Sequence, residues 1–175
     1  MGQSSGGHIV NEGKIKIEKL KSHPELVRFL AHLMFREFGY FFPDETEEEF
    51  EDVFQHRLNE NRLPIAFVAL EHGQFVGTFS LRENDPVLAK KFSPPLQENY
   101  SPWVGSVFVL PEKRKRGIGQ ILMERAKQET KKLGFRHLYL FTTDKEQWYV
   151  KLGFQTIEKS FLGKTPVAIM ECAIS

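Results

Sequence analysis

The sequence predicts an α/β fold, in which a mixed sheet of about seven strands carries helices on both of its faces. The chain has 175 residues with 41% hydrophobic content, which is enough for one core but short of a comfortable two-domain length. Strand-type and helix-type segments also follow one another in an order that a mixed sheet with covering helices satisfies. We therefore expect a flexible tail over residues 1–12 and a single domain over residues 13–175.

The first half of the chain is predicted to contain three strands and two helices. The stretch "KIKIEKL" alternates apolar and polar residues, as a half-buried strand does. A helix is expected from Ser22 to Gly39, with a capping box formed by Ser22 and Glu25. The capping pair Thr46 and Glu49 begins a second helix. "LPIAFVAL" and "QFVGTFSL" are β-rich runs around "EHG", which indicates a hairpin.

The second half is predicted to contain four more strands and two more helices. The connector "RENDPVLAKKFSPPLQENYSP" has the prolines and polar residues of a segment without regular structure, and loops of this length are usually functional or mobile. "WVGSVFVL" and "RHLYLFT" are strand-like runs on either side of a helix that ends at Gly134. A short helix then opens with Thr143 and Glu146 as its capping pair, and "FQTIEKSF" and "VAIMECAI" form the last two strands.

The composition excludes several classes of protein. The 24 Lys and Arg residues nearly balance the 23 Asp and Glu residues, so no global field favours nucleic acid or a membrane surface. The single cysteine, Cys172, rules out an internal disulfide framework and agrees with a reducing compartment. No apolar run approaches the roughly 20 residues of a membrane span, which indicates a cytoplasmic protein. The six histidines show no metal-binding spacing, so we predict no metal.

A cluster of positive charge stands where a helix is expected to begin. Cations beside a helix N-terminus are disfavoured, because the free N–H groups there already carry a partial positive charge. The cluster makes sense if an anion lies between the cations and the N–H groups, with glycines that let a phosphate approach the backbone. The residues of this turn are Arg114, Lys115, Arg116, Gly117, Ile118 and Gly119. A P-loop and a dinucleotide fingerprint are both excluded by the missing Lys-Ser/Thr and the missing third glycine.

Two motifs resemble those of the GCN5-related N-acetyltransferase (GNAT) family. "RKRGIG" matches the family's acetyl-CoA signature, Arg/Gln-x-x-Gly-x-Gly/Ala after a strand, and "YVKLGF" matches its second landmark, a Tyr four residues before Gly-Phe. The resemblance extends from about Ile15 to Ile174. It implies a mostly antiparallel sheet with splayed middle strands, and an enzyme that transfers an acetyl group from acetyl-CoA directly to an amine.

The resemblance also implies roles for particular residues. Pantetheine would enter between the splayed strands and pair with the strand that bears Val107, Phe108 and Val109. The pyrophosphate would rest on the turn from Lys115 to Gln120, and an N–H near Val109 would polarise the thioester carbonyl. Tyr149 holds the family's general-acid position, where a phenol can donate its proton to the departing sulfur.

The chain departs from its relatives at two positions. Trp103 stands where histone-type members carry a catalytic Glu, and Thr142 stands where many members place an Asn near the pantetheine. A base would then come from Glu83 or Asp85 on the long connector, or the proton leaves through ordered water. Aromatic residues that could shape the acceptor pocket, or pack in the core instead, are Tyr40, Phe41, Phe42 and Trp103.

The leading hypothesis is an N-acetyltransferase whose partners are acetyl-CoA and an amine, in a monomer or a homodimer. No cysteine is placed to form a covalent acyl-enzyme, which favours direct transfer. The alternative is a CoA-binding module of the same fold without catalysis, because the strand Glu and the Asn are missing. Nucleic-acid binding by "EKRKR" is excluded by the short run and by the lack of an aromatic stacking platform beside it.

Overall fold

The computed structural model describes residues 14–84, 86–97 and 99–175; the predicted tail of residues 1–12 lies outside the described residues. Eight strands form one open sheet in the order β1-β2-β3-β5-β6-β8-β7-β4. Seven of them are the predicted strands. The bounds of all eight are Ile15–Lys19 (β1), Ile65–Glu71 (β2), Gln74–Arg82 (β3), Phe92–Ser93 (β4), Trp103–Val109 (β5), His137–Thr142 (β6), Gln155–Leu162 (β7) and Thr165–Ala173 (β8).

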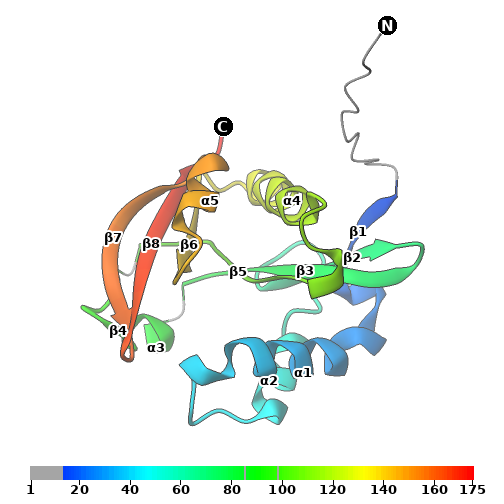
Figure 1. Ribbon diagram of the computed structural model, residues 1–175, viewed down its shortest axis with the longest axis horizontal. Coiled ribbons are helices and arrows are strands. Elements are labelled where there is room, and N and C mark those ends of the chain that lie inside the picture. The colour runs from blue at the N-terminus through cyan, green and yellow to red at the C-terminus, as the bar shows by residue number, and fades with distance from the viewer. Residues whose placement is uncertain (1–13, 85, 98) are drawn as a thin grey trace, which may run out of the picture.

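Helices cover both faces of the sheet, as the order of the elements predicted. In Figure 1, α4 and α5 lie above the sheet, whereas α1 and α2 lie below it. The α-helices are Val27–Phe38 (α1), Glu47–Gln55 (α2), Pro86–Ala89 (α3), Ile118–Lys132 (α4) and Glu146–Lys151 (α5). Short 3₁₀ turns are Leu20–Ser22 (η1), Pro24–Leu26 (η2), Gly39–Phe41 (η3) and Pro111–Lys113 (η4). None of the helices in the described ranges is long and apolar enough to cross a membrane.

The sheet divides between its two middle strands. All neighbouring strands pair antiparallel except β5 and β6, which are parallel. These two strands share one register pair, Trp103 with Tyr139, and the Tyr139 N–H donates to the Pro102 carbonyl at 2.9 Å. Beyond this point they diverge, and Figure 1 shows the β6–β8–β7 half turned steeply against the β2–β3–β5 half. The splayed middle strands that the family resemblance implied are thus present.

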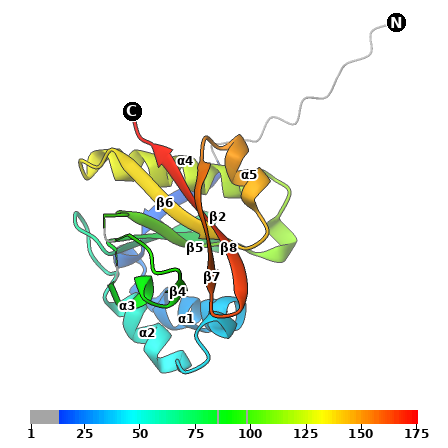
Figure 2. The same ribbon diagram turned by 90° about the vertical axis from the view of Figure 1, so that its left-hand side faces the viewer.

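The core has one layer on each side of the sheet. Side chains of β2, β3 and β5 alternate between the faces, so that Phe67 and Phe79 stack in the layer under α4 at 4.7 Å between ring centroids. The neighbouring positions Ala66 and Val68 pack instead against Leu30 on the α1 side. A third cluster fills the β4–β7–β8 end, which faces the viewer in Figure 2.

The predicted capping box of Thr46 and Glu49 forms, with both of its hydrogen bonds. The caps expected at Ser22 and at Thr143 do not form. α1 begins only at Val27, after two 3₁₀ turns. His23 forms ion pairs with Glu18 at 2.9 Å and with Glu25 at 3.4 Å. The Glu25 carboxylate therefore bonds His23 instead of completing a capping box with Ser22.

The start of α5 differs in a similar way. The Thr142 hydroxyl accepts from the Lys145 N–H at 3.1 Å, one position before the expected Thr143. The Glu146 carboxylate, expected to complete the cap, accepts instead from Lys159 at 2.7 Å. The connector also differs from expectation, since it contains α3 and the short strand β4 rather than irregular chain alone.

Candidate functional site

The turn between β5 and α4 presents a row of free backbone N–H groups. Lys115 (φ 61°) and Gly117 (φ 82°) both adopt the left-handed conformation, which curves the chain before α4 begins. Within the described part of the chain, no N–H from residue 115 to residue 120 donates to a carbonyl or a side chain. The first N–H of α4 with an acceptor is that of Ile121, which donates to the Gly117 carbonyl at 3.1 Å. Such a concave row of donors at a helix N-terminus is suited to bind an anion, as the sequence predicted, and we refer to residues 115–120 as the anion-binding turn.

The four cations of this turn have different partners. Arg116 donates to both carboxylate oxygens of Glu71, at 2.7 and 3.3 Å, and Lys113 donates to one of them at 3.2 Å. These bonds lower the pKa of Glu71 to about 2. Arg114 donates through Nε to the Val109 carbonyl at 2.9 Å, and Lys115 is exposed. One carboxylate therefore pairs with two of the four cations, and the other two leave the turn with an excess of positive charge.

The strand β5 carries a bulge beside the point where the sheet divides. Its pairing with β3 skips a position between Gly105 and Phe108, and Ser106 adopts a φ of 52° that is rare for a residue with a side chain. Val107 and Val109 pack toward the α4 layer, whereas Phe108 packs toward α1. The predicted pantetheine strand therefore borders the divided part of the sheet along its length.

Helix α5 packs directly against the beginning of α4. A Cβ atom on Gly119 would lie 3.2 Å from the Trp148 ring, so a side chain at this position would press against that ring. Tyr149, the next residue, is 8% exposed, and its ring contacts those of Trp148 and Phe154. α5 thus brings the predicted catalytic tyrosine close to the anion-binding turn.

The Tyr149 hydroxyl is held in its protonated form. Burial, and secondarily the Asp144 carboxylate, raises the pKa of Tyr149 to about 12. The hydroxyl donates to no described residue, and none of the described side chains has a buried polar atom without a partner. The hydroxyl therefore keeps contact with solvent, where an incoming group can reach it.

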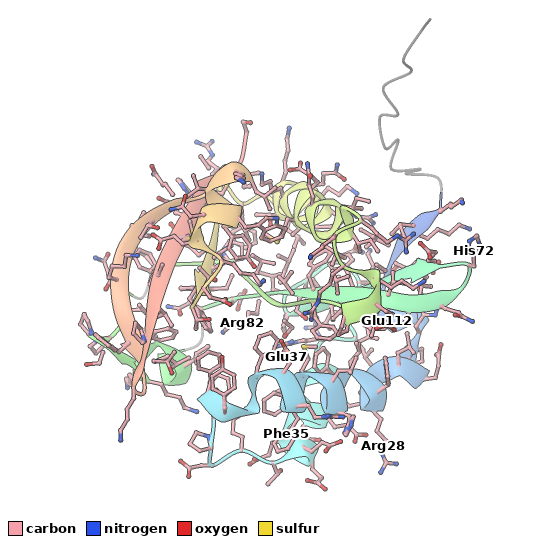
Figure 3. The ribbon with its side chains drawn as sticks, in the orientation of Figure 1. Arg28, Phe35, Glu37, His72, Arg82 and Glu112 are labelled. Atoms are coloured by element: carbon pink, nitrogen blue, oxygen red, sulfur yellow. The ribbon has the colours of Figure 1, made fainter. Side chains whose placement is uncertain are left out.

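A cavity of about 240 Å³ opens on the α1 side of the divided sheet. Aromatic side chains dominate its wall, and a smaller set of polar groups interrupts them. The lining residues are Met34, Phe38, Phe41, Phe42, Glu45, Phe50, Val53, Phe54, Arg57, Arg82, Leu88, Lys91, Ser106 and Phe141. Figure 3 shows Arg82 extending below β5 on the same side as α1. Since Ser106 of the β5 bulge lines this cavity, the cavity reaches the strand that is predicted to pair with pantetheine.

The cavity includes some of the predicted acceptor-site residues and not others. Phe41 and Phe42 line it. Tyr40 is exposed beside it, and Glu83 is exposed elsewhere on the connector. Trp103 is 2% exposed and packs with Tyr100 and Tyr139 at the point where β5 and β6 touch. Asp85 lies outside the described residues.

The sequence reasoning did not identify the polar residues of this cavity. Arg57 follows α2 in the polar stretch "QHRLNENRLP", which matches no motif. Arg82 ends β3, whereas Glu45 and Lys91 come from connecting segments, and the three are close only in the fold. Thr142, predicted beside the pantetheine, is buried at the end of β6 with its hydroxyl engaged by Lys145. No group of three or more His, Cys, Asp or Glu residues in the described ranges could hold a metal ion.

A divided sheet, an anion-binding turn and a tyrosine beside it define the class of CoA-dependent acyltransferases with a splayed α/β sheet. The chain matches the model of the acetyltransferase (GNAT) family over residues 27–154, and it belongs to this family. No curated protein sequence matches the chain.

Solved structures share the fold at low sequence identity. An aminoglycoside 6'-acetyltransferase type Ii is 21% identical with a TM-score of 0.66, over 91% of this chain and 97% of that one. An aminoglycoside 6'-N-acetyltransferase complexed with coenzyme A is 18% identical with a TM-score of 0.67, over 91% and 97%. An acyl-CoA N-acyltransferase from Pseudomonas aeruginosa is 20% identical with a TM-score of 0.60, over 91% and 99%. At these identities the likeness concerns the fold.

Proposed function

We propose that the protein is an N-acetyltransferase that transfers the acetyl group of acetyl-CoA directly to an amine. The observation that carries this proposal is a single arrangement. The β5–α4 turn has free N–H groups, β5 pairs with β6 at one position only, and Tyr149 lies on α5, which packs against the start of α4. We infer that these three features border one cleft, and Ser106 of β5 also lines the aromatic cavity. The donor set fits a CoA molecule, because the turn offers free N–H groups and excess positive charge to a pyrophosphate.

Each part of the cleft has a task in this reaction. The N–H groups from Lys115 to Gln120 bind the pyrophosphate, and the backbone of Val107 to Val109 pairs with the pantetheine amides. Acetyl-CoA supplies the acetyl group as a thioester. A β5 N–H near Val109 polarises its carbonyl, and the Tyr149 hydroxyl donates a proton to the departing sulfur while the amine nitrogen bonds to the carbonyl carbon.

The attacking amine must be neutral, and its proton needs a path away from the cavity. Glu45 is the carboxylate among the described lining residues, but Lys91 holds it in an ion pair at 3.1 Å. The Glu45 carboxylate is therefore already engaged by a cation. We therefore assign removal of the proton to solvent that enters the cavity, and two of the structurally similar proteins, the aminoglycoside acetyltransferases, make aminoglycosides one class of amine to test.

The cofactor assignment is tested by titrating acetyl-CoA into the wild type and the Gly117→Asp variant. Asp at this position adds a negative charge to the phosphate site and has to adopt a φ near 82°, which costs a non-glycine residue about 1 kcal/mol or more. We expect at least about tenfold weaker binding. Gly163→Asp is the matched control, because Gly163 also has a positive φ (62°) but lies in the β7–β8 turn. Equal affinity in all three proteins would remove the assignment.

Catalysis is tested separately by the release of free thiol from acetyl-CoA in the presence of a broad panel of amines and peptides. We expect at least one acceptor to gain the mass of an acetyl group. Binding of acetyl-CoA without acetylation of any acceptor would favour the alternative, a CoA-binding module, which the absence of a carboxylate on β5 at Trp103 suggests.

A further inference from the structure

The cavity wall contains a guanidinium group that is fixed in place but not neutralised. Arg57 follows α2, and its carbonyl accepts the Ala66 N–H at 3.2 Å, which ties this segment to β2. The guanidinium lies over the Phe54 ring, with its carbon 4.9 Å from the ring centroid. Its Nη1 donates to the hydroxyls of Ser80 (3.0 Å) and Ser106 (3.1 Å). These contacts leave little freedom in the position of the group.

The charge of Arg57 has no acidic partner among the residues that the structure describes. Both of its hydrogen-bond acceptors are neutral hydroxyls. Burial is the main cause that lowers the pKa of Arg57 to about 9, and the positive charge of Arg82 lowers it further. At neutral pH the group therefore remains charged in a poorly solvated place, beside a like charge. A buried charge without a counter-ion is costly, and a bound anion would relieve this cost.

The remaining donors of Arg57 are available to such an anion. Both of its hydrogen bonds leave from Nη1, so Nε and Nη2 donate to none of the described groups. No buried polar side-chain atom in the described ranges lacks a partner, which means that Nε and Nη2 keep accessible surface. Arg57 lines the cavity, and its open edge is the planar fork that binds a carboxylate through two parallel hydrogen bonds.

The surroundings of Arg57 define the rest of the ligand. Six phenylalanine rings line the cavity: Phe38, Phe41, Phe42, Phe50, Phe54 and Phe141. They suit an apolar or aromatic body, which gains free energy by leaving water. Nη1 is bonded to Ser106, which belongs to the β5 bulge, so an anion on Arg57 lies close to the strand along which pantetheine is proposed to bind.

We propose that the acceptor is a small amine that carries a carboxylate and an apolar or aromatic body, with its carboxylate bound by Arg57. This inference rests on the proposed function and deepens it by naming the substrate class. Anchoring the carboxylate near the β5 bulge places an amino group only a few bonds away beside the cleft, as in an apolar α-amino acid. Polycationic amines would meet the like charges of Arg57 and Arg82, and they are expected to be poor acceptors.

The test uses acceptors that differ in the carboxylate alone. Phenylalanine and phenethylamine share a ring and an amine, as do leucine and isoamylamine, and spermidine represents the polycations. With the wild type we expect kcat/KM, corrected for the fraction of neutral amine, to be at least about tenfold higher for the amino acids than for their decarboxylated partners. Arg57→Gln should bring the ratio of kcat/KM between each amino acid and its decarboxylated partner down toward one.

Two further variants keep the test interpretable. Arg57→Lys retains the charge but loses the fork, so it should fall between wild type and Arg57→Gln for the amino acids. Arg62→Gln is the matched control, because Arg62 is an exposed arginine of the same loop that donates to Asn59 and does not line the cavity. Unchanged acetyl-CoA affinity in Arg57→Gln shows that the variant is folded.

Failure of this inference differs from failure of the proposed function. If amines are acetylated with the same kcat/KM with or without a carboxylate, in both wild type and Arg57→Gln, the carboxylate site is refuted and the transferase activity stands. If no amine is acetylated, the proposed activity fails, and direct titration of phenylalanine and N-acetylphenylalanine into the CoA-bound protein decides the site. Equal binding by wild type and Arg57→Gln in that titration overturns it.

Discussion

Tyr149 is a weaker acid in this protein than a thiol is. With a pKa of about 12, the phenol cannot fully protonate a thiolate of ordinary pKa, about 8.5, without an energetic penalty. The Asp144 charge also opposes formation of a phenolate. In the proposed reaction we therefore expect the hydroxyl to act mainly as a hydrogen-bond donor to the sulfur while charge develops on it, with solvent completing the proton transfer.

Tyr149→Phe should lower kcat moderately and leave the binding of acetyl-CoA nearly intact. The ring and its packing on Trp148 and Phe154 remain, so acetyl-CoA affinity should change only a few-fold. We expect kcat to fall about 10- to 100-fold, the lower part of the range for general-acid catalysis. Steady-state kinetics and a binding titration measure the two effects. Tyr100→Phe serves as the control, because it removes a phenol that donates to Glu158 and lies in the Trp103–Tyr139 cluster rather than on α5. A wild-type kcat in Tyr149→Phe excludes the role in catalysis.

The β5–α4 turn depends on a neighbouring element for its shape. Glu71, at the end of β2, is 10% exposed at its side chain and bonds Arg116 and Lys113 from across the hairpin. Its folded pKa of about 2 lies below the ordinary value of 4.5, so the unfolded chain binds the proton more tightly. The resulting stabilisation is fully present above about pH 4.5 and is lost as the pH falls toward about 2.

Glu71→Gln should consequently destabilise the protein in a pH-dependent manner. Urea unfolding at pH 7 is expected to give a lower midpoint for the variant than for the wild type, and the difference should shrink by more than half near pH 3. Glu112→Gln provides the control, since Glu112 lies on η4 next to the same turn and has no ion pair with the described residues. A midpoint difference that stays constant with pH would show that Glu71 acts by packing alone.

Local patterns in the sequence predicted the elements better than their ends. The apolar periodicity and the glycines gave the seven principal strands and the four main helices. The box at Thr46 forms because its acidic partner, Glu49, has no competing cation, whereas His23 takes Glu25 and Lys159 takes Glu146. Lys159 comes from β7, so the local pattern around Thr143 does not contain it. His23 stands between Ser22 and Glu25, and the capping-box pattern simply does not count it as a competitor.

The difference between local and distant contacts also explains why one side of the candidate site could be predicted from the sequence and the other could not. The anion-binding turn is a contiguous segment, so its residues and its chemistry are visible in the sequence. The cavity is assembled from α1, α2, β3, β5, β6 and the segments that connect them. Arg57 is a candidate only because folding removes its charge from water without placing a carboxylate of the described residues beside it. Trp103 becomes a core residue because β6 brings Tyr139 against it.

At the scale of the whole molecule, the sheet behaves as two half-sheets that meet at one point. β1, β2, β3 and β5 form one half, and β6, β8, β7 and β4 form the other. Backbone pairing joins them only at Trp103 and Tyr139, and the helices and the Trp103–Tyr139–Tyr100 cluster supply the other contacts. The edges of β5 and β6 beyond this point have unpaired backbone groups, which a bound pantetheine would satisfy from both sides.

A ligand in this cleft should therefore couple the two halves rather than stabilise its contact residues alone. At a hundredfold excess over its Kd, a ligand that binds the folded state adds about 2.7 kcal/mol of stability. We expect CoA to slow amide hydrogen exchange in both β5 and β6 as well as in the first turn of α4, and to slow it less in β1. Mass spectrometry of exchanged peptides from the wild type, with and without CoA, measures this.

The Gly117→Asp variant at the same CoA concentration should show little protection, because it lacks an intact phosphate site. Protection confined to the α4 turn would mean that CoA does not bridge β5 and β6, and that the divided sheet does not hold the pantetheine.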